Sequence, residues 1–293
     1  MEQLEYKKML EAGVHFGHLK KKWNPKMSPY IFMEKKGIHL IDLYKTQDKL
    51  ETAANAVKSI ARTGKKVLFV ATKKQAKDFV KECATSVNMP FVTERWLGGM
   101  LTNFATIRKS IRKMQTIEKM LSDGTFENIT KKEKLVLSRE KEKLERVIGG
   151  IAGLSRIPAA IFIVDISHEH IALAEANKLN MTSIAMVDTN SNPNTVDFPI
   201  PANDDASKSI HLIVEYVTEA IKEGLMERQK DKAEVEAAKA AKEEEEDDDV
   251  LTQEEEKKKK KLEKQAQEED EKGEDTTVKK AKKKIVTKKP KKD

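Results

Sequence analysis

The sequence RWLGGMLTN at residues 95–103, together with GGIAG at residues 149–153, decides the architecture of this chain. Between these segments, apolar residues recur three or four positions apart, the spacing that places side chains on one stripe of a helix. This outgoing stripe consists of Phe104, Ile107, Ile111, Met114, Ile117 and Leu121. We therefore predict a helical hairpin over residues 103–148. The glycines expected to reach positive φ at its base are Gly98, Gly99, Gly149 and Gly150.

The second half of the hairpin has a start signal of its own. A turn is expected at residues 122–124. Thr130 followed by Glu133 then forms a capping-box pattern, in which each side chain bonds a backbone N–H of the new helix. The apolar seam after it is as narrow as that of a two-stranded antiparallel coiled coil. It consists of Leu137, Leu144 and Ile148.

The hairpin carries a positive charge on surface that the narrow seam leaves exposed. Residues 103–148 contain 12 Lys and Arg against 7 Asp and Glu, a net charge of +5. One interpretation is that this charged helix face is exposed to water and binds no partner, as is common for charged helix faces. Alternatively, such a hairpin lies along the phosphates of a nucleic acid.

Charge is distributed unevenly along the 293 residues. Residues 1–148 have a net charge of +14, residues 149–232 of −5 and residues 233–293 of −2, which together give +7. This division indicates one surface on a polyanion and another on water or protein. The last segment has no aromatic residue and contains long acidic and lysine runs, so we predict a disordered charged tail.

Several classes of protein and site are disfavoured. The single cysteine, Cys83, falls on the apolar stripe of an expected helix and is predicted to be a buried structural thiol. No signal-peptide core and no membrane-spanning run is present, which predicts a cytoplasmic protein. The histidine pairs His15 with His18 and His168 with His170 have metal-ligand spacing, but no cysteine pair completes a zinc pattern. No metal or other cofactor is therefore predicted.

Residues 1–36 combine glycines, prolines, lysines and aromatic residues. The glycines and prolines argue against regular structure and the aromatic residues argue against disorder, so we predict an ordered, irregular basic arm. Such a surface suits nucleic acid. The alternative is that the aromatic rings dock on the neighbouring domain and only the lysines face outward.

Residues 37–232 alternate short apolar runs with amphipathic helical patterns. Strands are expected at residues 38–43, 67–71, 91–92, 159–165 and 183–188. Strands that are apolar on both faces and alternate with helices specify a parallel sheet that is covered on both sides. The prediction is a doubly wound α/β domain interrupted by the hairpin.

Polar residues follow the predicted strands, where open α/β sheets bind ligands. They include Lys73, Asp165, His168 and Asp188. The turn at residues 70–74 lacks the glycines of a phosphate cradle, however, and no nucleophile elbow is present. We expect these residues to be helix caps and turn formers without a catalytic task, and we keep an α/β enzyme or nucleotide-binding protein as the alternative.

Five motifs carry a resemblance to a known family. They are GVHFGH at 13–18, WNPKM at 23–27, RWLGGMLTN at 95–103, DGTF at 123–126 and VDTN at 187–190. Over about residues 4–228, the chain resembles the ribosomal protein S two family of the bacterial small subunit. The resemblance implies a flavodoxin-like sheet with an inserted coiled-coil hairpin, and a structural role without enzymatic activity in the cytoplasmic ribosome.

The partners that the resemblance implies are small-subunit (16S) ribosomal RNA and neighbouring proteins, among them the messenger-binding protein S one. It implies a monomer within the ribosome, with neither DNA nor a membrane as partner. A third class, an RNA-binding regulator outside the ribosome, also stays open.

The residues expected to contact RNA are basic, aromatic or amide side chains of the arm, the hairpin and its flanks. They are Lys20, Lys21, Lys22, Trp23, Asn24, Lys26, Arg95, Asn103, Arg108, Lys109, Arg112, Lys113, Arg139 and Arg156.

Overall fold

The computed structural model describes residues 4–122 and 130–234. The chain divides into two units, Met1–Gln229 and Lys230–Asp293. In the second unit the described residues, 230–234, are helical. The rest of the predicted tail and most of the predicted hairpin turn lie outside the described residues.

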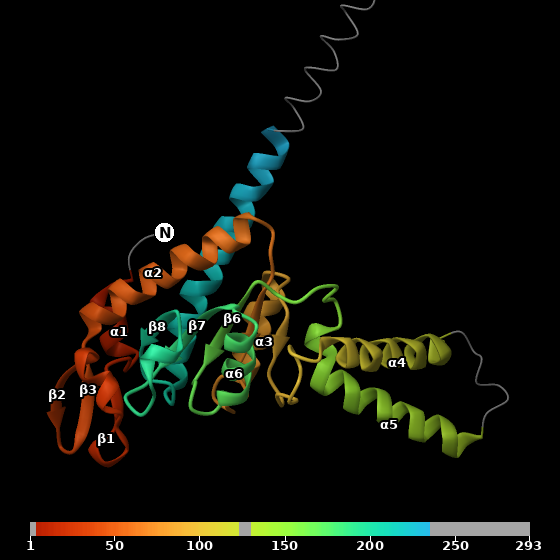
Figure 1. The fold of residues 1–293 in the computed structure, drawn as a ribbon, viewed down its shortest axis with the longest axis horizontal. Coiled ribbons are helices and arrows are strands. Elements are labelled where there is room, and N and C mark those ends of the chain that lie inside the picture. Colours follow the sequence, from red (N-terminus) through yellow and green to blue (C-terminus); the bar gives the residue numbers. More distant parts are fainter. Residues whose placement is uncertain (1–3, 123–129, 235–293) are drawn as a thin grey trace, which may run out of the picture. The chain divides into compact units, whose positions relative to one another are not determined.

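A five-stranded parallel sheet forms the centre of the first unit (Figure 1). Its strand order is β5-β4-β6-β7-β8. The strands are β4 (Val67–Val70), β5 (Phe91–Val92), β6 (Ala160–Val164), β7 (Thr182–Val187) and β8 (Phe198–Pro201). The predicted doubly wound α/β class, with a parallel sheet and flanking helices, is confirmed.

Each face of this sheet has its own core because alternate side chains point to opposite sides. One core joins Phe69, Phe162 and Ile184 to α2 (Leu43–Arg62), α3 (Lys77–Ser86) and the helix of residues 207–229. The second joins Leu68, Ile161 and Ala185 to α6 (His170–Lys178) and to the base of the hairpin. The base of the hairpin is thus part of one sheet-covering layer.

Strand β8 was not expected because it contains Pro199 and Pro201. A proline has no N–H for the ladder, so it is tolerated at the edge of a sheet. In the structure β8 pairs with β7 alone and follows the short 3-10 turn η5 (Pro193–Thr195).

The N-terminal segment differs from its prediction. After α1 (Tyr6–Glu11), the antiparallel strands β1 (Phe16–Leu19), β3 (Ile38–Ile41) and β2 (Ile31–Lys35) form a separate sheet in that order. The expected irregular arm is wrong in this respect, and the expected boundary at residue 36 divides this sheet. Two 3-10 turns, η1 (Lys20–Lys22) and η2 (Pro25–Tyr30), lie between β1 and β2, and η2 contains both prolines of the segment, outside the ladder.

Residues 38–43 were expected to form a strand of the parallel sheet. Their strand, β3, belongs to the antiparallel sheet instead. Side chains of β3 alternate between half-buried and buried, whereas all four side chains of β4 are buried. The alternating pattern is that of a sheet with only one covered face.

The hairpin consists of α4 (Phe104–Ser122) and α5 (Lys131–Ile148), which run side by side (Figure 1). The predicted stripe is buried at Ile107, Ile111, Met114 and Ile117. The capping box of Thr130 is present. Both parts of the prediction are therefore confirmed.

The base glycines do not share one role. Only Gly99 has positive φ, at +87°. Gly150, in the 3-10 turn η4 (Gly149–Ile151), is required for close approach, since a Cβ there would lie 2.2 Å from the carbonyl oxygen of Phe91. Gly98 and Gly149 have neither constraint, so the expectation of positive φ was wrong for three of the four.

Within the described ranges, no helix is both long and apolar enough to cross a membrane.

Candidate nucleic-acid interface and the polar network at the strand ends

The arm offers exposed cations held on ordered turns. Lys21, Lys22 and Lys26 are exposed, and the Lys20 ammonium lies 2.7 Å from the Glu34 carboxylate. The turn that carries Lys26 is capped by another predicted residue, Asn24.

Two predicted RNA-binding residues of the arm also make contacts within the protein. Asn24 accepts the Lys26 N–H at 3.0 Å, and its own N–H donates to the Thr189 carbonyl at 2.8 Å. The half-buried Trp23 ring packs against His39, with ring centroids 5.1 Å apart. Their contribution to RNA binding stays a prediction.

On the hairpin, the exposed cations are divided between free and paired side chains. Within the described residues, Arg108, Lys109 and Arg112 form no ion pair, whereas Lys113 pairs with Glu140 across the hairpin. Exposed ion pairs contribute little stability, so this pair adds little to the hairpin.

The remaining predicted residues lie around the hairpin. Arg95, Arg139 and Arg156 are exposed. Asn103, directly before α4, accepts the Thr106 hydroxyl at 2.9 Å. Its side chain is therefore partly used within the first turn of the helix.

The predicted RNA-binding residues of the hairpin and those of the arm lie near different edges of the parallel sheet. The hairpin base contacts β5, at one edge of the parallel sheet, through Gly150 and Phe91. The arm contacts Thr189, two residues after the end of β7 and near the other edge, where the His18 N–H donates to the Thr189 hydroxyl at 2.8 Å. The sequence did not predict this separation.

A buried carboxylate at the hairpin base was not predicted from the sequence. Glu175 in α6 is 8% exposed and accepts hydrogen bonds from the loop directly before α4. Burial alone would raise its pKa, but the backbone N–H groups of Thr102, Gly99 and Leu101 hold the pKa below the ordinary value. Its signal in the sequence is a lone acid between the apolar residues Ala172 and Ala176 on one helix face.

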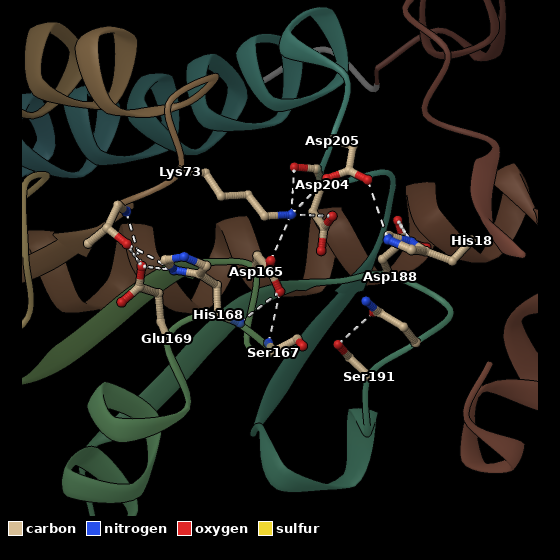
Figure 2. A network of polar contacts seen from close by, with 12 residues as sticks. His18, Lys73, Asp165, Ser167, His168, Glu169, Asp188, Ser191, Asp204 and Asp205 are labelled. Atoms are coloured by element: carbon tan, nitrogen blue, oxygen red, sulfur yellow. Dashed lines mark hydrogen bonds and ion pairs between the residues drawn. The ribbon is translucent and has the colours of Figure 1, made fainter. Parts of the chain in front are cut away.

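A second network of charged groups lies at the carboxyl ends of the strands (Figure 2). The Lys73 ammonium lies 2.7 Å from Asp165, 2.7 Å from Asp204 and 2.9 Å from Asp205. Burial and the neighbouring charges of Asp165 and Asp188 raise the pKa of Asp204 to about 7. Burial opposes ionisation of Lys73, but the adjacent carboxylates outweigh it and raise the pKa of the ammonium.

His18 extends this network to the N-terminal sheet. Its Nδ1 lies 2.9 Å from Asp188 Oδ2 and its Nε2 lies 3.4 Å from Asp205 Oδ2 (Figure 2). The hydrogen bond with Asp188 outweighs burial and raises the pKa of His18. The network therefore joins two sheets that are distant in the sequence.

The predicted cap and turn roles of the strand-end acids agree with the geometry. Asp165 accepts the N–H groups of Ser167 at 2.8 Å and His168 at 3.3 Å. Asp188 accepts the Thr189 hydroxyl at 3.1 Å. The Asp165 carboxylate thus holds a turn, and the Asp188 carboxylate fixes the residue that follows it, in addition to their ionic contacts.

The described residues include one group that could hold a metal ion. His18, Asp188 and Asp204 each offer a ligand atom, and these atoms lie within 4.8 Å of one another. Sequence spacing singled out pairs of histidines, whereas this group combines one histidine with two acids from distant segments. In the described residues, the polar side chains at the strand ends hold a turn, through Asp165, and link the two sheets, through His18 and Asp188.

The chain is thus a parallel α/β domain that carries a basic helical hairpin. Comparison with known proteins gives the family. The model of the family "Ribosomal protein S2" matches residues 9–224. The chain belongs to the ribosomal protein S2 family.

Curated relatives agree with this family. The "Small ribosomal subunit protein uS2" of Parabacteroides distasonis is 58% identical over 241 residues, covering 82% of this chain and 87% of the relative. The protein of the same name from Cytophaga hutchinsonii is 62% identical over 231 residues, covering 79% and 91%. The one from Flavobacterium johnsoniae is 59% identical over 239 residues, covering 82% and 94%.

Family membership confirms the main functional predictions. The protein is a structural, non-enzymatic component of the small subunit in the cytoplasmic ribosome, where it associates with small-subunit RNA and proteins. The enzyme and the extraribosomal regulator are not favoured. The family model ends at residue 224 and does not cover the charged tail.

Proposed function

We propose that the protein binds ribosomal RNA through the hairpin and, separately, through the lysines of the arm. The observation that carries this proposal is the exposed set Arg108, Lys109 and Arg112, which has no acidic partner among the described residues. These side chains share α4 with the buried stripe that attaches the hairpin to the domain. Their positive charge is thus presented from a fixed base, which suits binding to phosphates.

The test replaces Arg108, Lys109 and Arg112 together by Gln and measures incorporation into small subunits that lack this protein. Each lost phosphate contact reduces the salt slope of binding by about one unit. The expected result is weaker incorporation and a slope lower by about three units. Circular dichroism should report an unchanged fold.

A charge-matched control replaces three exposed lysines of the acidic half, Lys178, Lys208 and Lys222, by Gln. This variant has the same net charge but an intact hairpin, so its slope should stay close to that of the parent. Equal slopes for the two triple variants would reduce the effect to net charge and contradict the proposal.

The messenger-binding protein S one is the specific neighbour that we propose. This proposal is supported by the five sequence motifs that resemble the ribosomal protein S two family, because that resemblance implies S one as a neighbour. The test is co-purification of S one with small subunits that contain or lack this protein. Equal recovery from both preparations would contradict the proposal.

A further inference from the structure

We propose that Glu175 is a positioning residue that sets the direction in which the hairpin leaves the α/β domain. This inference rests on the proposed function, because the direction matters only if the hairpin contacts RNA.

The loop before α4 is folded around the Glu175 carboxylate. Oε1 accepts the Trp96 indole N–H at 3.2 Å and the Gly99 N–H at 2.7 Å. Oε2 accepts the Leu101 N–H at 2.9 Å, the Thr102 N–H at 3.0 Å and the Thr102 hydroxyl at 3.2 Å. All of these donors lie within residues 96–102, and only Asn103 separates them from Phe104, the first residue of α4.

The carboxylate is chemically suited to this task. Both of its oxygens accept hydrogen bonds, and an ionised acceptor forms stronger bonds than a neutral one. An amide has a single oxygen, and its NH₂ group would face N–H groups that need an acceptor. Glutamine at position 175 would therefore leave donors of the loop unsatisfied, although its size is nearly the same.

The backbone of the loop is adapted to the same contact. Gly99 donates the shortest of the bonds and has φ +87°, a conformation that residues with a Cβ rarely adopt. On the returning side, Gly150 packs against the backbone of Phe91. The hairpin is thus attached at two places, the carboxylate of α6 and the edge strand β5.

A change at this base is amplified along the hairpin. With a rise of 1.5 Å per residue, the 19 residues of α4 span about 28 Å. A tilt of about 10° at the base would therefore move the far end of α4 by about 5 Å. Such a displacement exceeds the roughly 3 Å of a hydrogen bond, so distal cations would lose their phosphates.

The experiment measures the hairpin direction directly in the full-length protein. In a Cys83→Ala background, spin labels are placed at the exposed positions Asn55 of α2 and Glu142 of α5. Pulsed electron paramagnetic resonance measures the distance between the two spin labels. Glu175→Gln should shift the mean distance by several ångströms or broaden its distribution on that scale, and should weaken incorporation into small subunits.

Glu169→Gln is the matched control. Glu169 is also buried, at 4% exposure, and accepts the Thr72 N–H at 3.1 Å, but none of its hydrogen bonds to the described part of the chain involves the hairpin base. This variant should lower the melting temperature without changing the label distance. An equal shift in both variants, or an unchanged distance in folded Glu175→Gln, would overturn the inference.

A milder variant keeps the test informative if Glu175→Gln does not fold. Thr102→Val removes only the hydroxyl donor to Glu175 Oε2 and should produce a smaller shift of the label distance. An unchanged distance in this variant would then overturn the inference.

The label distance also separates this inference from the proposed function. If the distance shifts but incorporation and its salt slope are unchanged, Glu175 positions the hairpin and the RNA-binding role of the hairpin fails. If the triple Gln variant loses binding while the distance is unaffected by Glu175→Gln, only the positioning role fails.

Discussion

Glu175 at the hairpin base and Asp204 at the strand ends are both buried carboxylates, but their surroundings differ. Glu175 receives backbone and side-chain N–H groups and an adjacent hydroxyl, and its pKa is lowered. Asp204 shares the single Lys73 ammonium with other aspartates, and its pKa is raised to about 7. Fixed donors thus stabilise a buried charge without competition, whereas carboxylates that share one cation also repel one another.

The largest effect is expected from removing the shared cation. Lys73→Met leaves Asp165, Asp204 and Asp205 without their common ammonium, and breaking a buried ion pair costs about 3–5 kcal/mol of unfolding free energy. Urea unfolding measures this loss. Lys74→Met is the control, because Lys74 is exposed and should change stability by no more than about 0.5 kcal/mol. Equal losses would show that the ionic network contributes nothing specific.

At the hairpin base, steric fit gives the next largest effect. Gly150→Ala would place a Cβ 2.2 Å from the Phe91 carbonyl oxygen, so the backbone must shift, at a cost of about 1–3 kcal/mol. Gly98→Ala is matched in chemistry but meets no atom within 4 Å and should be nearly neutral. Thermal unfolding of both variants checks the difference. A neutral Gly150→Ala would remove β5 as an attachment of the hairpin.

The two carboxylates should have opposite pH dependences. Between about pH 4 and 7, native Asp204 keeps a proton that the unfolded state has lost, so its contribution makes stability fall as pH rises. The slope is at most about 1.4 kcal/mol per pH unit. Glu175, with a lowered pKa, contributes stability that is present above its ordinary pKa of 4.5 and is lost as pH falls below it.

Urea unfolding of the parent and of Asp204→Asn at several pH values measures the Asp204 contribution. The difference in unfolding free energy between the two proteins should change steadily from pH 4 to 7. His18 adds a slope of the same sign near pH 6.5 and above, because its raised pKa stabilises the protein when the imidazole is protonated. A pH-independent difference would show that Asp204 is ionised throughout this range.

The smallest effect is expected at the exposed pair of Lys113 and Glu140. Both side chains are in contact with water, so a double-mutant cycle with Gln at each position should give a coupling of about 0.2–1 kcal/mol. A coupling as large as the loss in Lys73→Met would remove the distinction between exposed and buried ion pairs in this protein.

Local sequence patterns predicted the elements whose burial is periodic. The stripe from Ile107 to Ile117 and the capping box at Thr130 specified the hairpin because helix period and N-terminal capping act within a few residues. The near-continuous apolar runs of β4 and β6 likewise specified a buried parallel sheet. Strand β8 was missed because its prolines contradict the usual strand signal.

The candidate site was predicted less completely. The cations of the arm and hairpin were identifiable by charge and spacing, but their separation near different edges of the sheet follows from strand order. Glu175 was visible only as an acid on an apolar helix face, and its partners lie more than 70 residues earlier in the chain. The contact of His18 with Asp188 likewise spans the fold.

The sequence by itself determined the hairpin, the α/β class and the division into basic and acidic halves, because period, capping and charge are local properties. The tertiary structure alone decided that β3 joins an antiparallel sheet, that Gly150 touches β5 and that Glu175 holds the loop before α4. Hydrogen bonds and ion pairs depend on distances of about 3 Å between atoms. For residues far apart in the chain, those distances are set only when the whole domain is packed.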